Sequence, residues 1–195
     1  MAVLVTGGAR SGKSRFAERY AKTLGTSGLY VATMTESDDE LRARIGAHRR
    51  RRAESGFPWR TVEEPLDVAG VLRRADAESE TSGEVILIDC LTLWLSNWLL
   101  RLEHEPDADE RLERLIGELA EAVASARRPV IAVTNEVGGG VVPAYPLGRR
   151  FRDFAGWMNQ RVAEACDEVF LVTAGIPVEL KRLAFRPDGE GETGH

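Results

Sequence analysis

A glycine-rich segment close to the start of the chain limits the folds that this sequence can adopt. Residues 7–14 read GGARSGKS and match the pattern G-x-x-x-x-G-K-[ST] in full. An apolar, β-branched run at residues 3–6 comes directly before this segment, and residues 15–24 carry apolar side chains at helical spacing. The chain is therefore predicted to begin with a strand, a tight loop and a helix.

The residues of this loop suit a polyphosphate ligand. Gly7 and Gly12 allow backbone conformations that other residues avoid, so consecutive N–H groups can turn inward around phosphate oxygens at the positive end of the helix. Lys13 is expected to reach the β- and γ-phosphate oxygens, and the Ser14 hydroxyl is expected to bind Mg²⁺. The alternative is a chance glycine-rich turn, but the flanking strand and helix are the context that a nucleotide-binding loop requires.

Strands alternate with helices along the rest of the chain. The first helix is predicted to stop at Gly25, a residue type common just beyond a helix end, and a capping box at Ser37 opens a helix that runs into the HRRRR segment. Gly175 and Pro177 are expected to separate the last strand from a short final piece. We expect further strands at residues 29–33, 85–88, 130–134 and 169–173, and a brief extended piece at 59–62. Further helices are expected at about 66–73, 91–102, about 111–126 and about 147–165.

The strands are near-continuous apolar runs, which is typical of a parallel sheet covered on both faces. The predicted fold class is α/β, with a mostly parallel sheet and helices on both sides. The length of 195 residues fits one domain, which we place at residues 1–185. Residues 75–84 are polar and predicted to form an exposed loop, and residues 186–195 are expected to be a disordered tail. In such sheets, ligands bind beyond the carboxyl ends of the strands.

Charge and cysteine content exclude several classes of protein. Lys plus Arg total 26 and Asp plus Glu total 31, so the net charge is −5, which argues against bulk attraction to nucleic acid or to an anionic membrane. The two cysteines lie far apart in the sequence and fit neither a zinc site nor a disulfide scaffold. No stretch resembles a signal peptide or a membrane span. We therefore expect a cytoplasmic protein without nucleic-acid or membrane partners.

Asp89 ends the apolar run VILID. In nucleotide-binding proteins of this kind, an acidic residue at the end of a strand holds Mg²⁺ directly or through water. The alternative is a carboxylate that caps the following helix, LTLW. Both roles remain open from the sequence.

His48 lies on the same predicted helix face as Leu41 and Ile45, whereas arginines surround it. A neutral imidazole is a good nucleophile, and nearby guanidinium groups disfavour its protonation and neutralise an incoming polyphosphate. These residues suit attack on phosphorus. The alternatives are a partly buried histidine with a structural hydrogen bond, and a nucleic-acid contact through HRRRR, which the acidic balance weakens.

Together these segments resemble the bifunctional adenosylcobinamide kinase / adenosylcobinamide-phosphate guanylyltransferase family of cobalamin biosynthesis. The resemblance spans about residues 3–181. It rests on LVTGGARSGKSR, YVAT, the ARI-x-x-H helix that ends in His48, WRTVEEP, VILIDCLT, VTNEVGGGVVP, FRDFAGWMNQR and DEVFLVTAGIPVELK. The pairing of VTNEVG-x-G-x-VP with R-x-FRD-x-x-G-x-x-NQ is much more specific than the phosphate-binding loop alone.

This resemblance implies a RecA-like P-loop fold, a homotrimer and two reactions. ATP or GTP phosphorylates adenosylcobinamide; GTP then gives GMP to a histidine, which passes it to adenosylcobinamide phosphate to form adenosylcobinamide-GDP. His48 matches the guanylylated histidine, Lys13 is the second catalytic residue, and Ser14 and Asp89 are the metal ligands. The implied nucleotide site comprises Gly7, Gly8, Ala9, Arg10, Ser11, Gly12, Lys13, Ser14, Ala32, Thr33, Met34, Arg49, Arg50, Arg51, Arg52, Glu63 and Asp89.

Two further segments have open roles. Asn135 and Glu136 could orient the corrinoid arm or the γ-phosphate, or they could belong to a structural loop or a subunit contact. Arg152, Asp153, Asn159 and Gln160 could contact the corrinoid or a neighbouring subunit. The rival functions are a P-loop kinase of another small molecule, without the guanylyl step, and a RecA-like ATPase or nucleotide switch.

Overall fold

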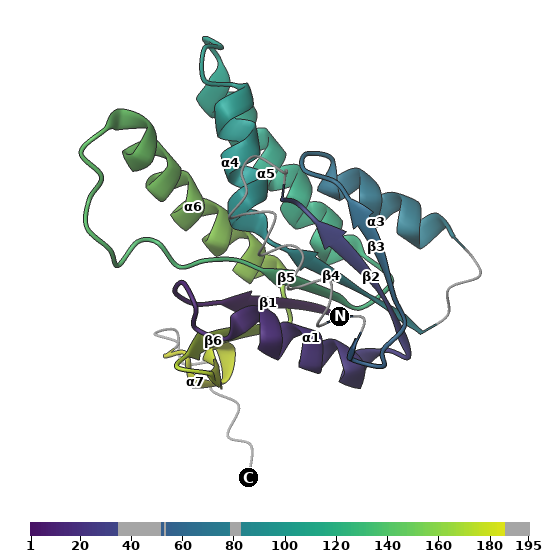
Figure 1. Ribbon diagram of the computed structural model, residues 1–195. Helices are drawn as coiled ribbons and strands as arrows, with labels where there is room; N and C mark the ends of the chain where they lie inside the picture. The colour runs from purple at the N-terminus through teal and green to yellow at the C-terminus, as the bar shows by residue number, and fades with distance from the viewer. Residues whose placement is uncertain (35–51, 53, 79–82, 186–195) are drawn as a thin grey trace.

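A seven-stranded sheet runs through the computed structural model, which describes residues 1–34, 52, 54–78 and 83–185 (Figure 1). The strand order is β3-β2-β4-β5-β1-β6-β7, and every pair is parallel except β6–β7. The predicted mostly parallel sheet is therefore confirmed. The strands are β1 (Ala2–Thr6), β2 (Ser27–Ala32), β3 (Trp59–Glu63), β4 (Glu84–Asp89), β5 (Val130–Val133), β6 (Glu168–Thr173) and β7 (Ile176–Glu179).

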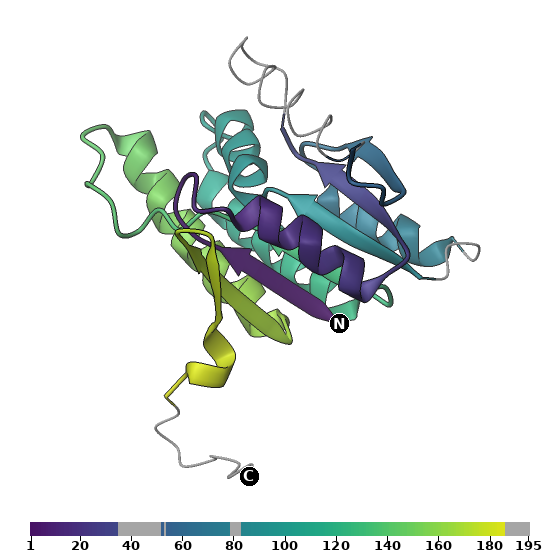
Figure 2. The same ribbon diagram turned by 60° about the horizontal axis from the view of Figure 1, so that its bottom comes forward.

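Helices cover both faces of the sheet, as the apolar strands predicted. Helix α1 packs on one face, where Ala17 and Ala21 belong to the same core cluster as Val3 and Val5. The larger core lies on the other face, so Figure 2 shows α1 in front of the sheet and α5 and α6 behind it. The helices are α1 (Lys13–Leu24), α3 (Val68–Ala77), α4 (Leu91–Arg101), α5 (Ala108–Ser125), α6 (Pro146–Ala165) and α7 (Leu180–Leu183). Within the described residues, no helix is long and apolar enough to cross a bilayer.

The prediction that α1 stops before Gly25 is confirmed, but for a different reason. Gly25 has an extended backbone, with φ −156°, rather than the left-handed conformation of a typical helix cap. A Cβ atom on Gly25 would lie 2.5 Å from the carbonyl oxygen of Gly83. Glycine is needed here because the chain passes close to the start of β4.

The end of the sheet differs from its prediction. Gly175 and Pro177 do not separate β6 from a loose piece, because β7 begins at Ile176 and pairs antiparallel with β6. Ala174 and Gly175 both have positive φ, 52° and 81°, which matches the twist that a two-residue hairpin loop requires. Pro177 is tolerated because β7 is an edge strand.

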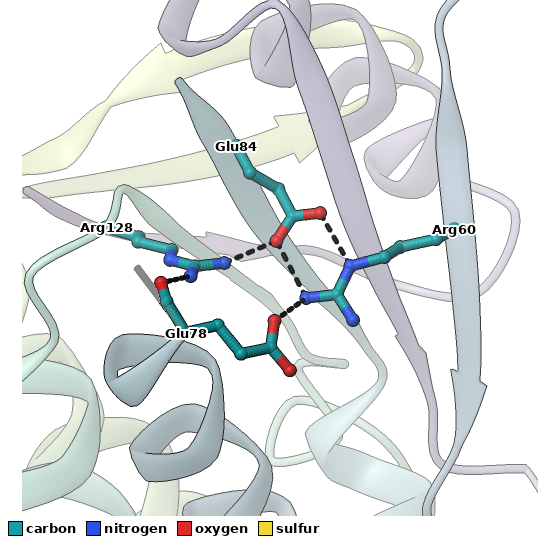
Figure 3. Close-up of polar contacts among 4 residues, drawn as sticks. All are labelled: Arg60, Glu78, Glu84 and Arg128. Atoms are coloured by element: carbon teal, nitrogen blue, oxygen red, sulfur yellow. Dashed lines mark hydrogen bonds and ion pairs between the residues drawn. The ribbon is translucent and has the colours of Figure 1, made fainter. Parts of the chain in front are cut away.

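The prediction that residues 75–84 form an exposed loop is partly wrong. Helix α3 runs to Ala77, beyond its predicted end, and Glu84 is buried as the first residue of β4. The carboxylate of Glu84 accepts hydrogen bonds from Arg60 Nε at 2.7 Å and from Arg128 Nη1 at 2.5 Å (Figure 3). Residues 79–82, the predicted tail at 186–195 and most of the predicted His48 helix lie outside the described residues.

Glu78 completes this group of charges. Its carboxylate accepts a hydrogen bond from Arg60 Nη2 at 2.8 Å, and its carbonyl oxygen accepts one from Arg128 Nη2 at 2.8 Å (Figure 3). The hydrogen bonds to Glu84 raise the pKa of Arg60 most, and the hydrogen bond to Glu78 raises it further. We call Arg60, Glu78, Glu84 and Arg128 the Glu84 cluster. It ties the edge strand β3 to β4 and β5 at the amino ends of the strands.

Candidate active site

The glycine-rich loop leaves the carboxyl end of β1, which lies between β5 and β6. Gly12 precedes α1 with φ 95°, and Arg10 also has a positive φ, 57°. A Cβ on Gly7 would lie 2.4 Å from the carbonyl oxygen of Val172, and one on Gly12 would lie 3.2 Å from Gly175 Cα. The loop therefore needs these two glycines, because it packs tightly against β6 and the turn that follows it.

Lys13 begins α1 and is nearly buried, with 8% of its surface exposed. Its ammonium group donates to the carbonyl oxygen of Gly8 at 3.0 Å, so the side chain folds back along the loop. The first turn of α1 carries no acidic residue. The first N–H groups of a helix have no partner within the helix, and together with the lysine they give this end of α1 a positive potential suited to phosphate.

Asp89 ends β4 at the same edge of the sheet and is half-buried. Its Oδ2 accepts a hydrogen bond from the hydroxyl of Tyr30 at 2.9 Å. Burial, with a further contribution from Asp89, raises the pKa of Tyr30 well above its ordinary value, so this hydroxyl remains a donor. Helix α4 begins at Leu91 after Cys90 and has no side-chain cap, so the structure does not use Asp89 as a helix cap.

Thr33 follows β2 and is completely buried. Its hydroxyl accepts from the backbone N–H of Cys90 at 2.9 Å and donates to the carbonyl oxygen of Cys90 at 2.7 Å. Asn97 of α4 donates to the carbonyl oxygen of Thr33 at 2.9 Å. Thr33 therefore joins the ends of β2 and β4, while Ala32 and Met34 on either side of it are half-buried at the edge.

Arg52 is 5% exposed, although it comes from a run of four arginines. Its guanidinium carbon lies 3.5 Å from the centroid of the Tyr30 ring. Within the described residues, Nη1 of Arg52 is buried without a hydrogen-bond partner. Glu63 ends β3 beside Ala32 and is exposed.

The remaining predicted residues of this group cannot be placed. His48, Arg49, Arg50 and Arg51 lie outside the described residues. The structure thus brings the loop, the ends of β2, β3 and β4, and Arg52 to one edge of the sheet.

The loop after β5 joins this edge through α6. Asn159 accepts a hydrogen bond from the Thr134 hydroxyl at 2.7 Å and donates to the carbonyl oxygen of Asn135 at 3.1 Å. The Thr92 hydroxyl accepts from the backbone N–H of Asn135 at 2.7 Å. These bonds place the asparagine of the NQ motif beneath the NEVG segment.

Further hydrogen bonds hold the segment around Gly138 in the loop after β5. Arg152 donates to the carbonyl oxygen of Gly138 at 2.5 Å, and Glu136 accepts a hydrogen bond from the N–H of Gly138. The backbone N–H of Glu136 donates to the carbonyl oxygen of Gly7 at 3.1 Å. The two most specific motifs of the sequence therefore contact each other and reach the phosphate-binding loop.

The sequence did not indicate Tyr30, Thr92 and Thr134 as members of this edge. All three belong to, or directly follow, apolar runs that were interpreted as core. The available signal was position: Thr134 ends one predicted strand, and Thr92 lies just after the end of another. Nothing local distinguishes Tyr30 from a core aromatic residue, because its polar partner is 59 residues away.

The residues present fit a magnesium ion bound together with a nucleotide. Hydroxyl and carboxylate oxygens are the ligands that Mg²⁺ prefers, and it usually binds through one or two protein groups plus phosphates. Ser14 and Asp89 supply one of each, and Asp89 Oδ1 accepts no hydrogen bond in the described part of the chain. No group of three or more His, Cys, Asp or Glu residues able to hold a metal alone occurs among the described residues.

Comparison with known families gives a match over residues 3–180 to the family described as cobinamide kinase / cobinamide phosphate guanyltransferase. The bifunctional adenosylcobalamin biosynthesis protein CobP of Pseudomonas aeruginosa is 46% identical over 91% of this chain and 96% of its own length. The bifunctional adenosylcobalamin biosynthesis protein CobU of Escherichia coli is 44% identical over 93% of this chain and its entire length.

Solved structures resemble the chain at much lower identity. A protein from Pyrococcus horikoshii, 8% identical, overlaps 96% of this chain and 88% of its own with a TM-score of 0.52. The RadB recombinase, 15% identical, overlaps 87% of this chain and 73% of its own with a TM-score of 0.47. The first of these similarities concerns the fold alone.

Proposed function

The chain belongs to the cobinamide kinase / cobinamide phosphate guanyltransferase family, the bifunctional enzymes of cobalamin biosynthesis, and from this premise we propose how its residues divide the two reactions. The observation that carries the proposal is the positive loop and helix end at residues 7–14, which lies at the same sheet edge as Asp89 and Arg52, whose buried Nη1 has no hydrogen-bond partner within the described residues. A kinase without the guanylyl step is not favoured, because the match spans a family with both activities.

In the kinase reaction, the loop amides and Lys13 hold the triphosphate of ATP or GTP. The hydroxyl of adenosylcobinamide attacks the γ-phosphorus, and the nucleoside diphosphate leaves. Lys13 is already at the loop, 3.0 Å from the Gly8 carbonyl oxygen, so a small movement of its ammonium group delivers it to the β- and γ-oxygens. Ser14 and Asp89 would hold Mg²⁺, which would neutralise phosphate charge when bound.

In the guanylyl reaction, the nucleophile is His48. Its imidazole nitrogen attacks the α-phosphorus of GTP, the bond to the β-phosphate oxygen breaks, and pyrophosphate leaves. A phosphate oxygen of adenosylcobinamide phosphate then attacks the GMP phosphorus and releases the histidine. Arg49, Arg50, Arg51 and Arg52 supply positive charge to this step, and the burial of Arg52 supports that role.

The test of this division is intact mass after incubation with GTP and Mg²⁺. The wild-type chain should gain one GMP, mapped to the peptide that contains His48. His48→Ala should lose the adduct and the guanylyl activity but keep much of the kinase activity. The matched control is His104→Ala, because His104 is exposed in the turn between α4 and α5. Equal loss of both activities in His48→Ala would refute the division.

Three further properties belong to the same proposal. Residues 1–185 form one P-loop domain that assembles as a homotrimer, and exposed apolar side chains such as Leu100 and Tyr145 offer a surface for assembly. The protein works in the cytoplasm, which the two unpaired cysteines support. Light scattering after gel filtration would measure the number of subunits, and a monomer would contradict the trimer.

A further inference from the structure

Tyr30 lies in the middle of β2, and its ring belongs to the small core beneath α1. Its register partner on β4 is Leu87, yet its hydroxyl reaches Asp89, two residues further along the strand. The side chain therefore leans toward the carboxyl edge of the sheet. The ring of Trp59 packs edge-on against it, with centroids 6.1 Å apart, and holds it in that direction.

The same ring carries a positive charge on its face. The Arg52 guanidinium lies 3.5 Å from the ring centroid, within the range in which a cation is attracted to an aromatic face. Tyr30 thus contacts one carboxylate through its hydroxyl and one guanidinium through its face. Within the described residues, Tyr30 is the one residue that contacts the side chains of both Asp89 and Arg52.

These two opposite charges do not pair with each other. Nη1 of Arg52 is buried without a partner, and Oδ1 of Asp89 accepts no hydrogen bond, within the described residues. A buried charged donor without an acceptor is costly, so a structure that keeps one against Tyr30, whose hydroxyl contacts Asp89 at the carboxyl edge of the sheet, points to a missing acceptor. A ligand that gives both atoms a partner must place a cation at the Asp89 carboxylate and an anion at the Arg52 guanidinium.

We propose that Tyr30 is a positioning residue, which holds Asp89 and Arg52 apart and oriented so that together they receive a magnesium nucleoside triphosphate. This inference rests on the proposed function. The Tyr30 hydroxyl donates its hydrogen bond to Oδ2 of Asp89, which leaves Oδ1 for the metal. Its ring keeps the Arg52 guanidinium at the sheet edge, where Nη1 can donate to phosphate oxygen.

The test uses binding rather than turnover. A non-hydrolysable GTP analogue is titrated into the full chain by calorimetry, once with Mg²⁺ and once with EDTA. Tyr30→Phe keeps the ring and removes only the hydroxyl. It should weaken binding about tenfold with Mg²⁺, the size expected for one hydrogen bond to a charged group, and change binding less than about twofold in EDTA. Tyr30→Leu removes the ring as well and should weaken binding in both conditions.

The matched control is Tyr20→Phe. Tyr20 also donates its hydroxyl to a carboxylate, that of Glu168, but this pair lies at the amino end of β6. Its loss should leave both affinities unchanged. Equal weakening of Tyr30→Phe with Mg²⁺ and with EDTA would indicate a merely structural role and overturn the proposal, as would wild-type affinity. If the wild-type chain binds the analogue but forms no GMP adduct with GTP, the proposed function fails instead.

Discussion

At the amino ends of the strands the buried carboxylate of Glu84 contacts two guanidinium groups. At the carboxyl ends the guanidinium of Arg52 lies on the face of the Tyr30 ring, and its buried Nη1 has no hydrogen-bond partner within the described residues. Both edges place charge out of water, which is costly unless it is paired. The Glu84 cluster satisfies its charges within the chain. The carboxyl edge leaves donors and acceptors for a ligand.

This contrast separates charge used for stability from charge used for function. A closed cluster, such as that of Glu84, stabilises the fold as long as its buried carboxylate keeps its guanidinium partners. An open edge, such as that of Asp89 Oδ1 and Arg52 Nη1, gains further partners when the nucleotide binds. Substitutions at the two edges should therefore change different measurements.

The largest effect is expected at the open edge. Lys13→Ala removes the ammonium group that stabilises phosphate charge, so both activities should fall by about a thousandfold while the free energy of unfolding changes little. Steady-state assays of both reactions, with urea denaturation, measure the two quantities. Lys22→Ala, further along α1, is the control because its exposed ammonium group donates to the carbonyl oxygen of Ser55, away from the phosphate-binding loop. A large fall in the free energy of unfolding of Lys13→Ala would contradict the assignment of this edge to function rather than to stability.

The closed cluster should show the opposite behaviour. Glu84→Ala leaves Arg128 nearly buried without its carboxylate, so the free energy of unfolding should fall by about 3–5 kcal/mol. Urea denaturation tests this, and the KM for GTP of the folded fraction should remain within about twofold. Glu78→Ala is the control: its carboxylate is half-exposed, so the loss should be below about 1 kcal/mol. A changed KM with intact stability would reverse the assignment of this edge.

Asn159 tests an intermediate case, a half-buried amide that holds a loop of the open edge. Asn159→Leu leaves the Thr134 hydroxyl and the Asn135 carbonyl without their partner, so we expect a loss of about 1–3 kcal/mol in stability. The kcat/KM of the guanylyl step should fall by about tenfold in addition. Glu164→Ala, exposed on the same helix, should change neither. Unchanged kinetics in Asn159→Leu would show that the loop does not serve the reaction.

The smallest effect concerns the two thiols, one near each edge. Burial raises the pKa of Cys90 to about 11 and that of Cys166 to about 12. A raised pKa keeps a thiol protonated below that value, so iodoacetamide at pH 8 should label neither cysteine in the folded protein and both in urea. Peptide mass spectrometry measures the labelling. Faster labelling of Cys90 than of Cys166, reduced by GTP, would show that the carboxyl edge opens more readily.

The sequence alone determined the fold class and the centre of the site. Continuous apolar runs that alternate with helical periodicity specify a covered parallel sheet, and GGARSGKS specifies a phosphate loop at the end of its first strand. These patterns are local, because each is encoded by residues next to one another. The β6–β7 hairpin was missed because Pro177 was interpreted as the end of strand structure. Proline is excluded from central strands but tolerated in an edge strand such as β7.

Tertiary structure decided which buried polar groups have hydrogen-bond partners within the described chain and which do not. Glu84 looked like part of a solvated loop, and its burial depends on Arg60 and Arg128, which are 24 and 44 residues away. Tyr30 looked like core, and its role depends on Asp89, 59 residues away. Hydrogen bonding and burial are properties of neighbours in space, so the pairing of distant charges could be determined only after the sheet had brought its strand ends together.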